Sequence, residues 1–124
     1  MNNPAQDSYQ LYIGGEWVDA SDGATLDSFC PATGEKLSTI ADATREDVDR
    51  AVEVAWKAFE TWGKTDKTER AAILNKVADI IEENAEKLAL LETLDNGKPI
   101  RETRAIDIAY SVDHFRYFAG VLLA

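Results

Sequence analysis

Two side chains in this sequence could form a nucleophile and its base: Cys30 and His114, the only cysteine and the only histidine. A cysteine attacks as its thiolate, so a catalytic cysteine lies beside a base, a cation or a helix N-terminus that lowers its pKa. Cys30 instead precedes a proline at the end of a predicted strand, and His114 lies among aromatic residues of a predicted helix. We therefore expect Cys30 to be a small apolar packing residue and His114 to pack or to cap a helix.

The residue types do not favour a zinc site, an acid–base site or a phosphate-binding site. A zinc site needs more cysteine and histidine ligands than the sequence contains. No glycine-rich phosphate-binding loop is present. None of the glutamates that could serve as acid or base stands in an apolar context that would raise its pKa; they are Glu35, Glu53, Glu82, Glu83, Glu92 and Glu102. The residues taken alone predict no catalytic site.

The elements that would position these side chains begin with a β-hairpin. The β-prone residues 9–13 and 16–18 flank Gly14 and Gly15. Glycine readily adopts positive φ, so this pair predicts a two-residue hairpin turn. Residues 1–8 are polar and are expected to be loosely ordered.

A second hairpin and a series of helices follow. Residues 25–30 and 35–40 are β-prone and flank a Pro-Ala-Thr-Gly turn at residues 31–34. From residue 44 onward the apolar residues recur every three or four positions, which is the period of amphipathic helices. Two short hairpins followed by helices predict an α+β arrangement for these 124 residues.

Helix boundaries are marked by specific residues. Thr44 is placed to cap a helix N-terminus, and Gly63 and Gly97 are placed to end helices. A second helical segment is expected to begin near Thr65 or Asp66. Asn84 is placed to cap a fresh helix within the second helical stretch. The last stretch, residues 100–124, has apolar residues on more than one face and reaches the end of the sequence without a stop signal.

Composition limits the classes of partner. The 124 residues suffice for one modest domain, and 45% are hydrophobic, so the chain can bury a core. The 23 acidic and 13 basic residues give a net charge of −10, which disfavours nucleic acids and anionic membranes as partners. One cysteine forms no internal disulfide, and no apolar run reaches the length of a membrane span. We expect a cytoplasmic protein.

Six short phrases, spread over nearly the whole chain, carry the strongest functional signal. They are residues 12–18 (YIGGEWV), 30–35 (CPATGE), 46–52 (EDVDRAV), 69–74 (ERAAIL), 91–99 (LETLDNGKP) and 113–120 (DHFRYFAG). In this order they resemble the N-terminal part of the aldehyde dehydrogenase superfamily. Residues 100–103 (IRET) and 113–118 (DHFRYF) look most like a bacterial branch that oxidises acetaldehyde and similar short aldehydes.

The resemblance implies an enzyme that oxidises a small aldehyde to a carboxylate and transfers hydride to NAD or NADP. It implies an α/β full-length fold with a Rossmann-like NAD-binding domain, of which residues 9–124 are the incomplete N-terminal part. In the family the nucleophilic cysteine, the glutamate base and the oxyanion-hole asparagine lie beyond the matched region, and asparagine usually stands at the position of Cys30. We therefore expect the isolated segment to be an inactive, cofactor-free fragment and the full-length protein to be a homo-oligomer.

The resemblance also implies two lesser sites. In several relatives a monovalent cation is held by backbone carbonyls and an aspartate that correspond to Ser28, Phe29 and Asp95, an oxygen-only set that suits a hard cation. Asp95 could equally end its helix by bonding local backbone. Ile106 and Tyr110 correspond to residues that line the substrate entrance, although ordinary helix packing would produce the same spacing.

A second functional hypothesis belongs to another class of protein. The chain could be a non-catalytic interaction module that docks on full-length dehydrogenase subunits. The broad apolar surface predicted for its last helix favours this hypothesis, because large exposed apolar patches often mark interaction sites.

Overall fold

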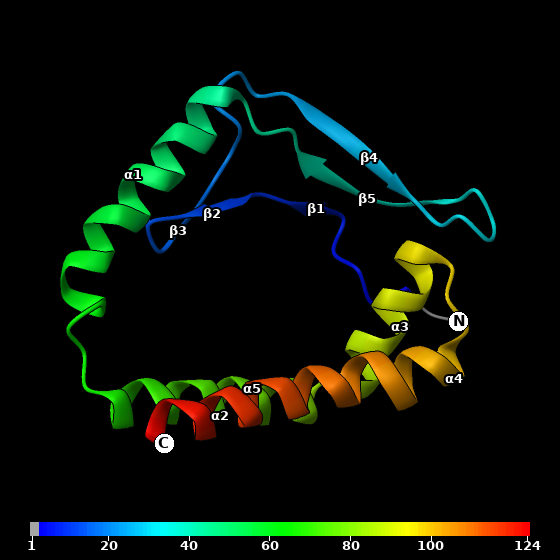
Figure 1. The fold of residues 1–124 in the computed structure, drawn as a ribbon. Helices are drawn as coiled ribbons and strands as arrows, with labels where there is room; N and C mark the ends of the chain where they lie inside the picture. The colour runs from blue at the N-terminus through cyan, green and yellow to red at the C-terminus, as the bar shows by residue number, and fades with distance from the viewer. Residues whose placement is uncertain (1–2) are drawn as a thin grey trace. The chain divides into compact units, whose positions relative to one another are not determined.

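The computed structural model describes residues 3–124, which divide into two compact units. The first unit is Ala5–Lys64 and contains the strands and the first helix; the second contains residues 65–124. The predicted α+β arrangement of short strands followed by helices is confirmed (Figure 1). Within the segment expected to be loosely ordered, residues 1–2 lie outside the described residues, and Ser8 belongs to a strand.

The first predicted hairpin is present as strands β2 (Leu11–Ile13) and β3 (Glu16–Val18), which pair antiparallel. Gly14 and Gly15 have φ values of 66° and 90°, a region that other residues adopt only with strain. A Cβ atom on Gly14 would lie 3.3 Å from Cγ1 of Val54 in the first helix. Glycine therefore permits both the turn and the close approach of the turn to that helix.

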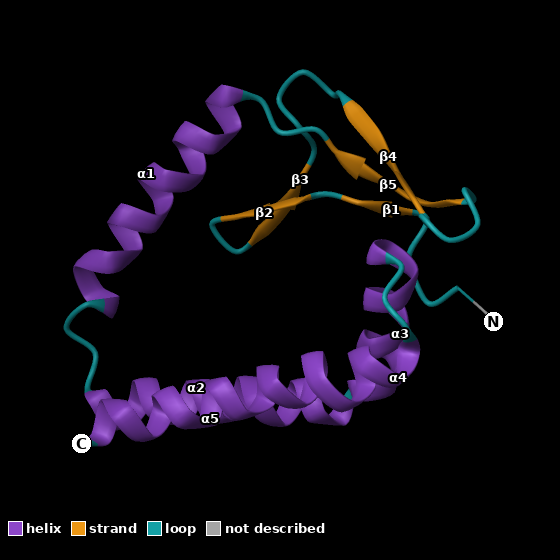
Figure 2. Ribbon diagram, turned by 45° about the vertical axis from the view of Figure 1, so that its right-hand side comes forward, coloured by secondary structure: helices purple, strands orange, loops and turns teal. Residues whose placement is uncertain are grey.

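The second predicted hairpin consists of β4 (Thr25–Phe29) and β5 (Lys36–Ala41), which also pair antiparallel (Figure 2, orange). A short strand that the sequence did not predict, β1 (Ser8–Tyr9), pairs with β5 in parallel and completes a sheet in the order β1-β5-β4. The predicted single run at residues 9–13 is thus divided between two sheets, because its first residue pairs with β5 and its last three with β3.

Helix α1 (Arg45–Trp62) begins and ends at the predicted residues. The hydroxyl oxygen of Thr44 accepts the backbone N–H of Asp47, and the Asp47 carboxylate accepts the backbone N–H of Thr44. This reciprocal capping box satisfies two N–H groups that the helix itself cannot satisfy. Gly63 follows the last helical residue and donates its N–H to a carbonyl of the final turn.

Helices α2 (Lys67–Glu83) and α3 (Ala85–Asn96) are separated only by Asn84. Helix α2 begins where the sequence predicted, next to Thr65 and Asp66, and the Asp66 side chain caps it. The Asn84 side chain makes no cap hydrogen bond to α3; its amide instead donates to the carbonyl of Ile80 at 2.8 Å. Asn84 is therefore the N-cap residue of α3, as predicted, but its side chain bonds the end of α2 and not the start of α3.

The last helical stretch is interrupted in a way that the sequence pattern did not predict. Gly97, with a φ of 81°, ends α3, and three segments follow: α4 (Ile100–Glu102), the π-helix η1 (Thr103–Ile108) and α5 (Ala109–Leu123). A π-helix has wider turns than an α-helix and is usually a short insertion that often lies at functional sites. Helix α5 packs along α2, and Figure 1 shows the two lying side by side.

The buried core is small and is made mainly of alanine. In residues 65–124 the buried apolar side chains are Ala71, Ala78, Ala89, Val112 and Ala119. Most of the exposed large apolar side chains of the helices lie on α1 and α5: Val48, Val52, Trp56, Phe59 and Trp62 on α1, and Tyr110, Tyr117, Phe118, Val121 and Leu123 on α5. Within residues 3–124, no helix combines the length and the apolar character that crossing a membrane would require.

Candidate functional site

Ser28 and Phe29, the first two residues expected at a cation site, lie at the end of β4. Ser28 is opposite Ser38 of β5, and Phe29 is opposite Lys36, so the register shifts between Ser28 and Phe29. The extra residue of this irregularity, Leu37, lies in β5 and not in β4. The turn beyond is closed by the N–H of Gly34, which donates to the carbonyl of Cys30 at 2.7 Å.

Asp95, the third expected ligand, lies in the last turn of α3 and is exposed. The side-chain oxygen of the next residue, Asn96, accepts the backbone N–H of Lys98 at 2.7 Å and so fixes the chain just after Gly97. Asp95 belongs to the unit of residues 65–124, whereas Ser28 and Phe29 belong to Ala5–Lys64. The expected ligands are therefore divided between the two units.

The two residues expected at a substrate entrance lie one turn apart, Ile106 in η1 and Tyr110 in α5, and 43% and 60% of their surfaces are exposed. Tyr110 lines a surface pocket of about 390 Å³, and Ile106 does not. The other lining residues are Asp113, His114, Tyr117 and Phe118. The structure thus places Tyr110 in an aromatic hollow and leaves Ile106 beside it on the preceding turn.

Thr103 anchors the segment that carries these two residues, although the sequence gave no reason to single it out. Its side chain is fully buried, and its hydroxyl donates to the carbonyl of Ala89 or of Ile100, each at 3.1 Å. The hydroxyl of Thr93 lies 2.9 Å from that of Thr103. A buried threonine that bonds a neighbouring helix fixes the start of η1, but a period of three or four residues cannot reveal such a contact.

An ion pair between Lys98 and Asp107 ties η1 to the loop after α3. The ammonium nitrogen lies 2.7 Å from one Asp107 carboxylate oxygen, and both side chains are about two-thirds covered. The hydrogen bond to Asp107 is the main reason that the pKa of Lys98 is raised, and burial opposes it. The second Asp107 oxygen is buried and has no hydrogen-bond partner within the described residues.

Cys30 has the packing position that was expected of it, whereas His114 lies on the surface of α5. The Cys30 side chain is buried. Its pKa is nevertheless lowered, chiefly by a hydrogen bond from the Thr33 side chain, and burial opposes this effect. His114 is exposed, and its Nδ1 lies 2.6 Å from the carbonyl oxygen of Tyr110.

The described residues do not form a metal cluster or a dinucleotide site. Within residues 3–124, no group of three or more histidine, cysteine, aspartate or glutamate side chains is placed to hold a metal ion. A dinucleotide site needs parallel strands joined through helices, with a glycine-rich turn at a helix N-terminus. The only parallel pairing in this part of the chain is the two-residue contact of β1 with β5. These residues alone therefore do not fit NAD.

Comparison with known proteins identifies the family of the chain. Residues 17–124 match the aldehyde dehydrogenase family. The whole chain is 46% identical to acetaldehyde dehydrogenase 2 of Cupriavidus necator and covers 24% of that protein. It is 47% identical over 116 residues to aldehyde dehydrogenase B of Escherichia coli, covering 94% of this chain and 23% of that protein.

Solved structures agree with the sequence comparison. The NAD+ complex of a Bacillus cereus aldehyde dehydrogenase matches 91% of the chain with a TM-score of 0.88 at 43% identity. An NAD-dependent aldehyde dehydrogenase of Sinorhizobium meliloti matches the same share with a TM-score of 0.87 at 40% identity. In both cases the chain covers 23% of the solved protein.

Over most of its length the chain therefore has the backbone of NAD-dependent aldehyde dehydrogenases of known structure. It belongs to the aldehyde dehydrogenase family. The chain matches the N-terminal portion of these relatives and spans about a quarter of their length.

Proposed function

We propose that residues 9–124 form the N-terminal part of the NAD-binding domain of an NAD(P)-dependent aldehyde dehydrogenase. The whole enzyme would be a cytoplasmic homo-oligomer that oxidises a small aldehyde to a carboxylate. The family match over residues 17–124 is the observation that carries this proposal, and the 46% identity to an acetaldehyde dehydrogenase favours a short aldehyde. NAD is favoured over NADP because solved relatives contain NAD+.

The 124 residues alone are proposed to be catalytically inactive. Covalent aldehyde oxidation needs a nucleophile, a base and oxyanion donors held together around the substrate. Cys30 is the only thiol of the sequence, and it is buried. The exposed apolar faces of α1 and α5 support the same proposal, since they provide surface against which further family structure can pack.

A chimera tests the proposed function directly. Residues 1–124 would replace the matching quarter of the Cupriavidus necator relative, and NADH formation from acetaldehyde would be measured by absorbance. We expect activity from the chimera, and none from residues 1–124 alone or from the relative without its matching quarter. Aldehyde-dependent NADH formation by the isolated 124 residues would overturn the proposal of inactivity, and a folded but inactive chimera would overturn the proposed role.

Ile106 and Tyr110 are proposed to line the substrate entrance of the complete enzyme. In the chimera, Tyr110→Ala is expected to change the ratio of kcat/KM for hexanal and acetaldehyde by about tenfold, because a cavity of this size alters the fit of several methylene groups. Tyr12→Ala is the matched control, since Tyr12 is exposed to a similar degree, 61% against 60%. Equal ratios in both variants would remove Tyr110 from the entrance.

Ser28, Phe29 and Asp95 are proposed to bind a monovalent cation through the two backbone carbonyls and the carboxylate. The place of Ser28 and Phe29 at the end of β4, where the regular register with β5 is interrupted, supports this proposal. Crystals of the chimera grown with rubidium in place of sodium should show anomalous scattering beside Asp95. Absence of that signal at a site that is otherwise ordered would end the proposal.

The alternative is a non-catalytic module that docks on intact dehydrogenase subunits. The exposed aromatic face of α5, which includes Tyr110, Tyr117 and Phe118, is the observation that favours it. Mixing the 124 residues with the intact Cupriavidus necator enzyme distinguishes the docking function from the dehydrogenase function. Co-elution in size-exclusion chromatography would support docking, and separate elution together with an active chimera would support the dehydrogenase role.

A further inference from the structure

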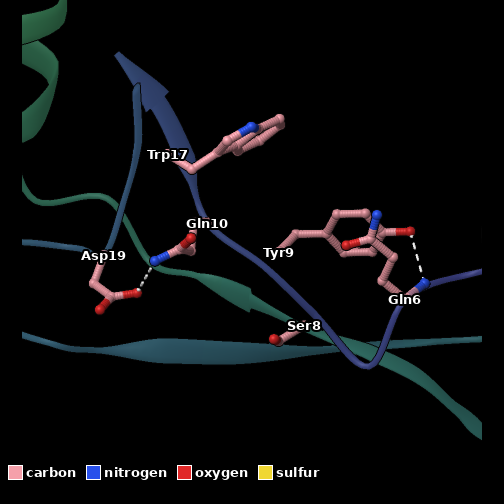
Figure 3. A pocket seen from close by; sticks show the side chains of 6 residues that line it. All are labelled: Gln6, Ser8, Tyr9, Gln10, Trp17 and Asp19. Carbon is pink, nitrogen blue, oxygen red and sulfur yellow. Dashed lines mark hydrogen bonds between the residues drawn. The ribbon is translucent and has the colours of Figure 1, made fainter. Parts of the chain in front are cut away.

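The outward face of the first hairpin forms a pocket that the proposed dehydrogenase function does not use. It encloses about 520 Å³, within the range of about 300–1,000 Å³ that is usual for small-molecule sites. We call it the acid–aromatic pocket; its lining residues are Gln6, Ser8, Tyr9, Gln10, Trp17 and Asp19 (Figure 3). All six lie within Ala5–Lys64, so the pocket is complete within one unit.

Strand register places the polar and aromatic parts of this pocket side by side. Tyr12 and Trp17 are directly opposite each other in the β2–β3 ladder, with ring centroids 4.8 Å apart. Gln10 is two residues before Tyr12, and Asp19 is two residues after Trp17, which places both on the same face as the rings. The Gln10 amide donates to the Asp19 carboxylate at 2.8 Å. Trp17 is therefore supported by Tyr12 on one side while 63% of its surface remains exposed.

The other side of the pocket is formed by the segment that leads into β1. The Tyr9 hydroxyl oxygen accepts the backbone N–H of Gln6 at 2.9 Å, which holds the Tyr9 ring in place. Figure 3 shows this pair on one side of the pocket and the Gln10–Asp19 pair on the other, with Ser8 between them. The pocket thus combines two aromatic rings, two amides, two hydroxyls and one carboxylate.

The charge of the pocket is negative and is not neutralised from within. Its lining contains no lysine, arginine or histidine. Among residues 3–124, Asp19 has its single hydrogen bond from Gln10 and no ion pair, whereas Asp27 of the neighbouring sheet is paired with Lys36 at 2.6 Å. The chain as a whole carries a net charge of −10, which further favours cations over anions at this surface.

We propose that the acid–aromatic pocket binds a small organic ammonium ion. Tryptophan and tyrosine rings attract ammonium groups through the negative charge of their faces, and tryptophan does so most strongly. The Asp19 carboxylate supplies the charge partner, and the side-chain oxygens of Gln6 and Ser8 can accept a hydrogen bond from a hydroxyl that the ammonium ion carries, as choline does. A neutral polyol could also donate hydroxyl hydrogen bonds to the carboxylate, but it would gain neither the charge attraction to Asp19 nor the attraction of a cation to the aromatic rings.

Two-dimensional NMR of the unmodified 124-residue chain can test this proposal with choline as the probe. The three indole N–H signals report on Trp17, Trp56 and Trp62, and Trp17→Phe assigns the first. We expect choline to move the Trp17 signal saturably, with a dissociation constant on the order of 1–10 mM for a partly exposed cation–π site. The neutral isostere 3,3-dimethyl-1-butanol should bind at least about fivefold more weakly.

A matched pair of variants tests the role of the carboxylate. Asp19→Asn preserves the shape of the side chain and is expected to weaken choline binding about fivefold. Asp42→Asn removes one exposed negative charge outside the pocket and should leave the affinity within about twofold of the parent chain. Equal binding of choline and its isostere, equal shifts of Trp17 and Trp56, or an Asp19→Asn variant that binds like the parent would each overturn the proposal.

Discussion

Replacement of Asp47 by alanine is expected to lower the thermal unfolding midpoint of the unit Ala5–Lys64 by roughly 10 °C. Only 1% of the Asp47 surface is exposed. Its Oδ2 atom accepts the backbone N–H of Ser21 and that of Thr44, each at 3.0 Å. Alanine would leave both N–H groups without this partner and would remove half of the capping box of α1.

Tryptophan fluorescence is a suitable readout for this variant, because Trp17, Trp56 and Trp62 all lie in the unit that contains Asp47. Asp49→Ala provides the control. Asp49 is exposed, and its one ion pair, with Arg45, is long at 3.9 Å, so its loss should change the midpoint by no more than about 2 °C. A similar midpoint for the two variants would show that the buried hydrogen bonds of Asp47 add nothing to stability.

The same carboxylate makes a pH prediction with a definite sign. The N–H of Ser21 is the largest influence that lowers the pKa of Asp47 from its ordinary 3.8 to about 2; burial opposes it, and the Thr44 N–H lowers the pKa further. Because the folded-state pKa is depressed, the stabilisation is present above pH 3.8 and is lost as the pH falls through about 2. The difference in unfolding midpoint between the parent chain and Asp47→Asn should therefore shrink over this interval. A difference that stays constant from pH 6 to pH 2 would contradict the depressed pKa.

Replacement of Ala78 by leucine is expected to destabilise the unit of residues 65–124 by about 2–3 kcal/mol. Ala71 and Ala78 of α2 are both buried and are seven residues apart, as are Val112 and Ala119 of α5. Residues seven apart lie on one side of a helix after two turns, so small side chains recur along the packed surface of each helix. Leucine at a position with no exposed surface would force α2 and α5 apart or into strained rotamers.

Amide hydrogen exchange in α5 would measure this effect where it arises, and urea unfolding followed by far-UV circular dichroism would give its size. Ala72→Leu makes the same chemical change at an exposed neighbouring position and should alter the free energy of unfolding by no more than about 0.5 kcal/mol. Protection of the α5 amides that is equal in the two variants would show that α2 and α5 do not depend on close contact at Ala78.

Turns and helix ends could be predicted because their causes lie within a few residues. Gly14 and Gly15 form the predicted hairpin turn at positive φ, and Gly97 ends α3 in the same conformation. Thr44 caps α1, and Asp66 caps α2. Each of these features depends on the backbone preference of one residue or on a hydrogen bond to a residue two or three positions away.

Contacts between distant residues could not be predicted in this way. The apolar spacing of α1 marks one face, yet Val48, Val52 and Phe59 on that face are half or more exposed, because periodicity does not identify what covers a face. The π-helix η1 carries the buried hydrogen bond of Thr103 and the Asp107 partner of Lys98, and neither contact has a sequence period. The acid–aromatic pocket likewise depends on strand register.

The sequence by itself determined the local elements and, through six ordered phrases, the family to which the chain belongs. Only the tertiary structure decided that Ser8 and Tyr9 pair with β5, that Asp47 is bonded to Ser21, and that Trp17 and Asp19 share a pocket. The physical reason is sequence separation. Asp47 and Ser21 are 26 residues apart, and a hydrogen bond over such a distance forms only when the packing of the whole unit has offset the entropy of closing the loop between them.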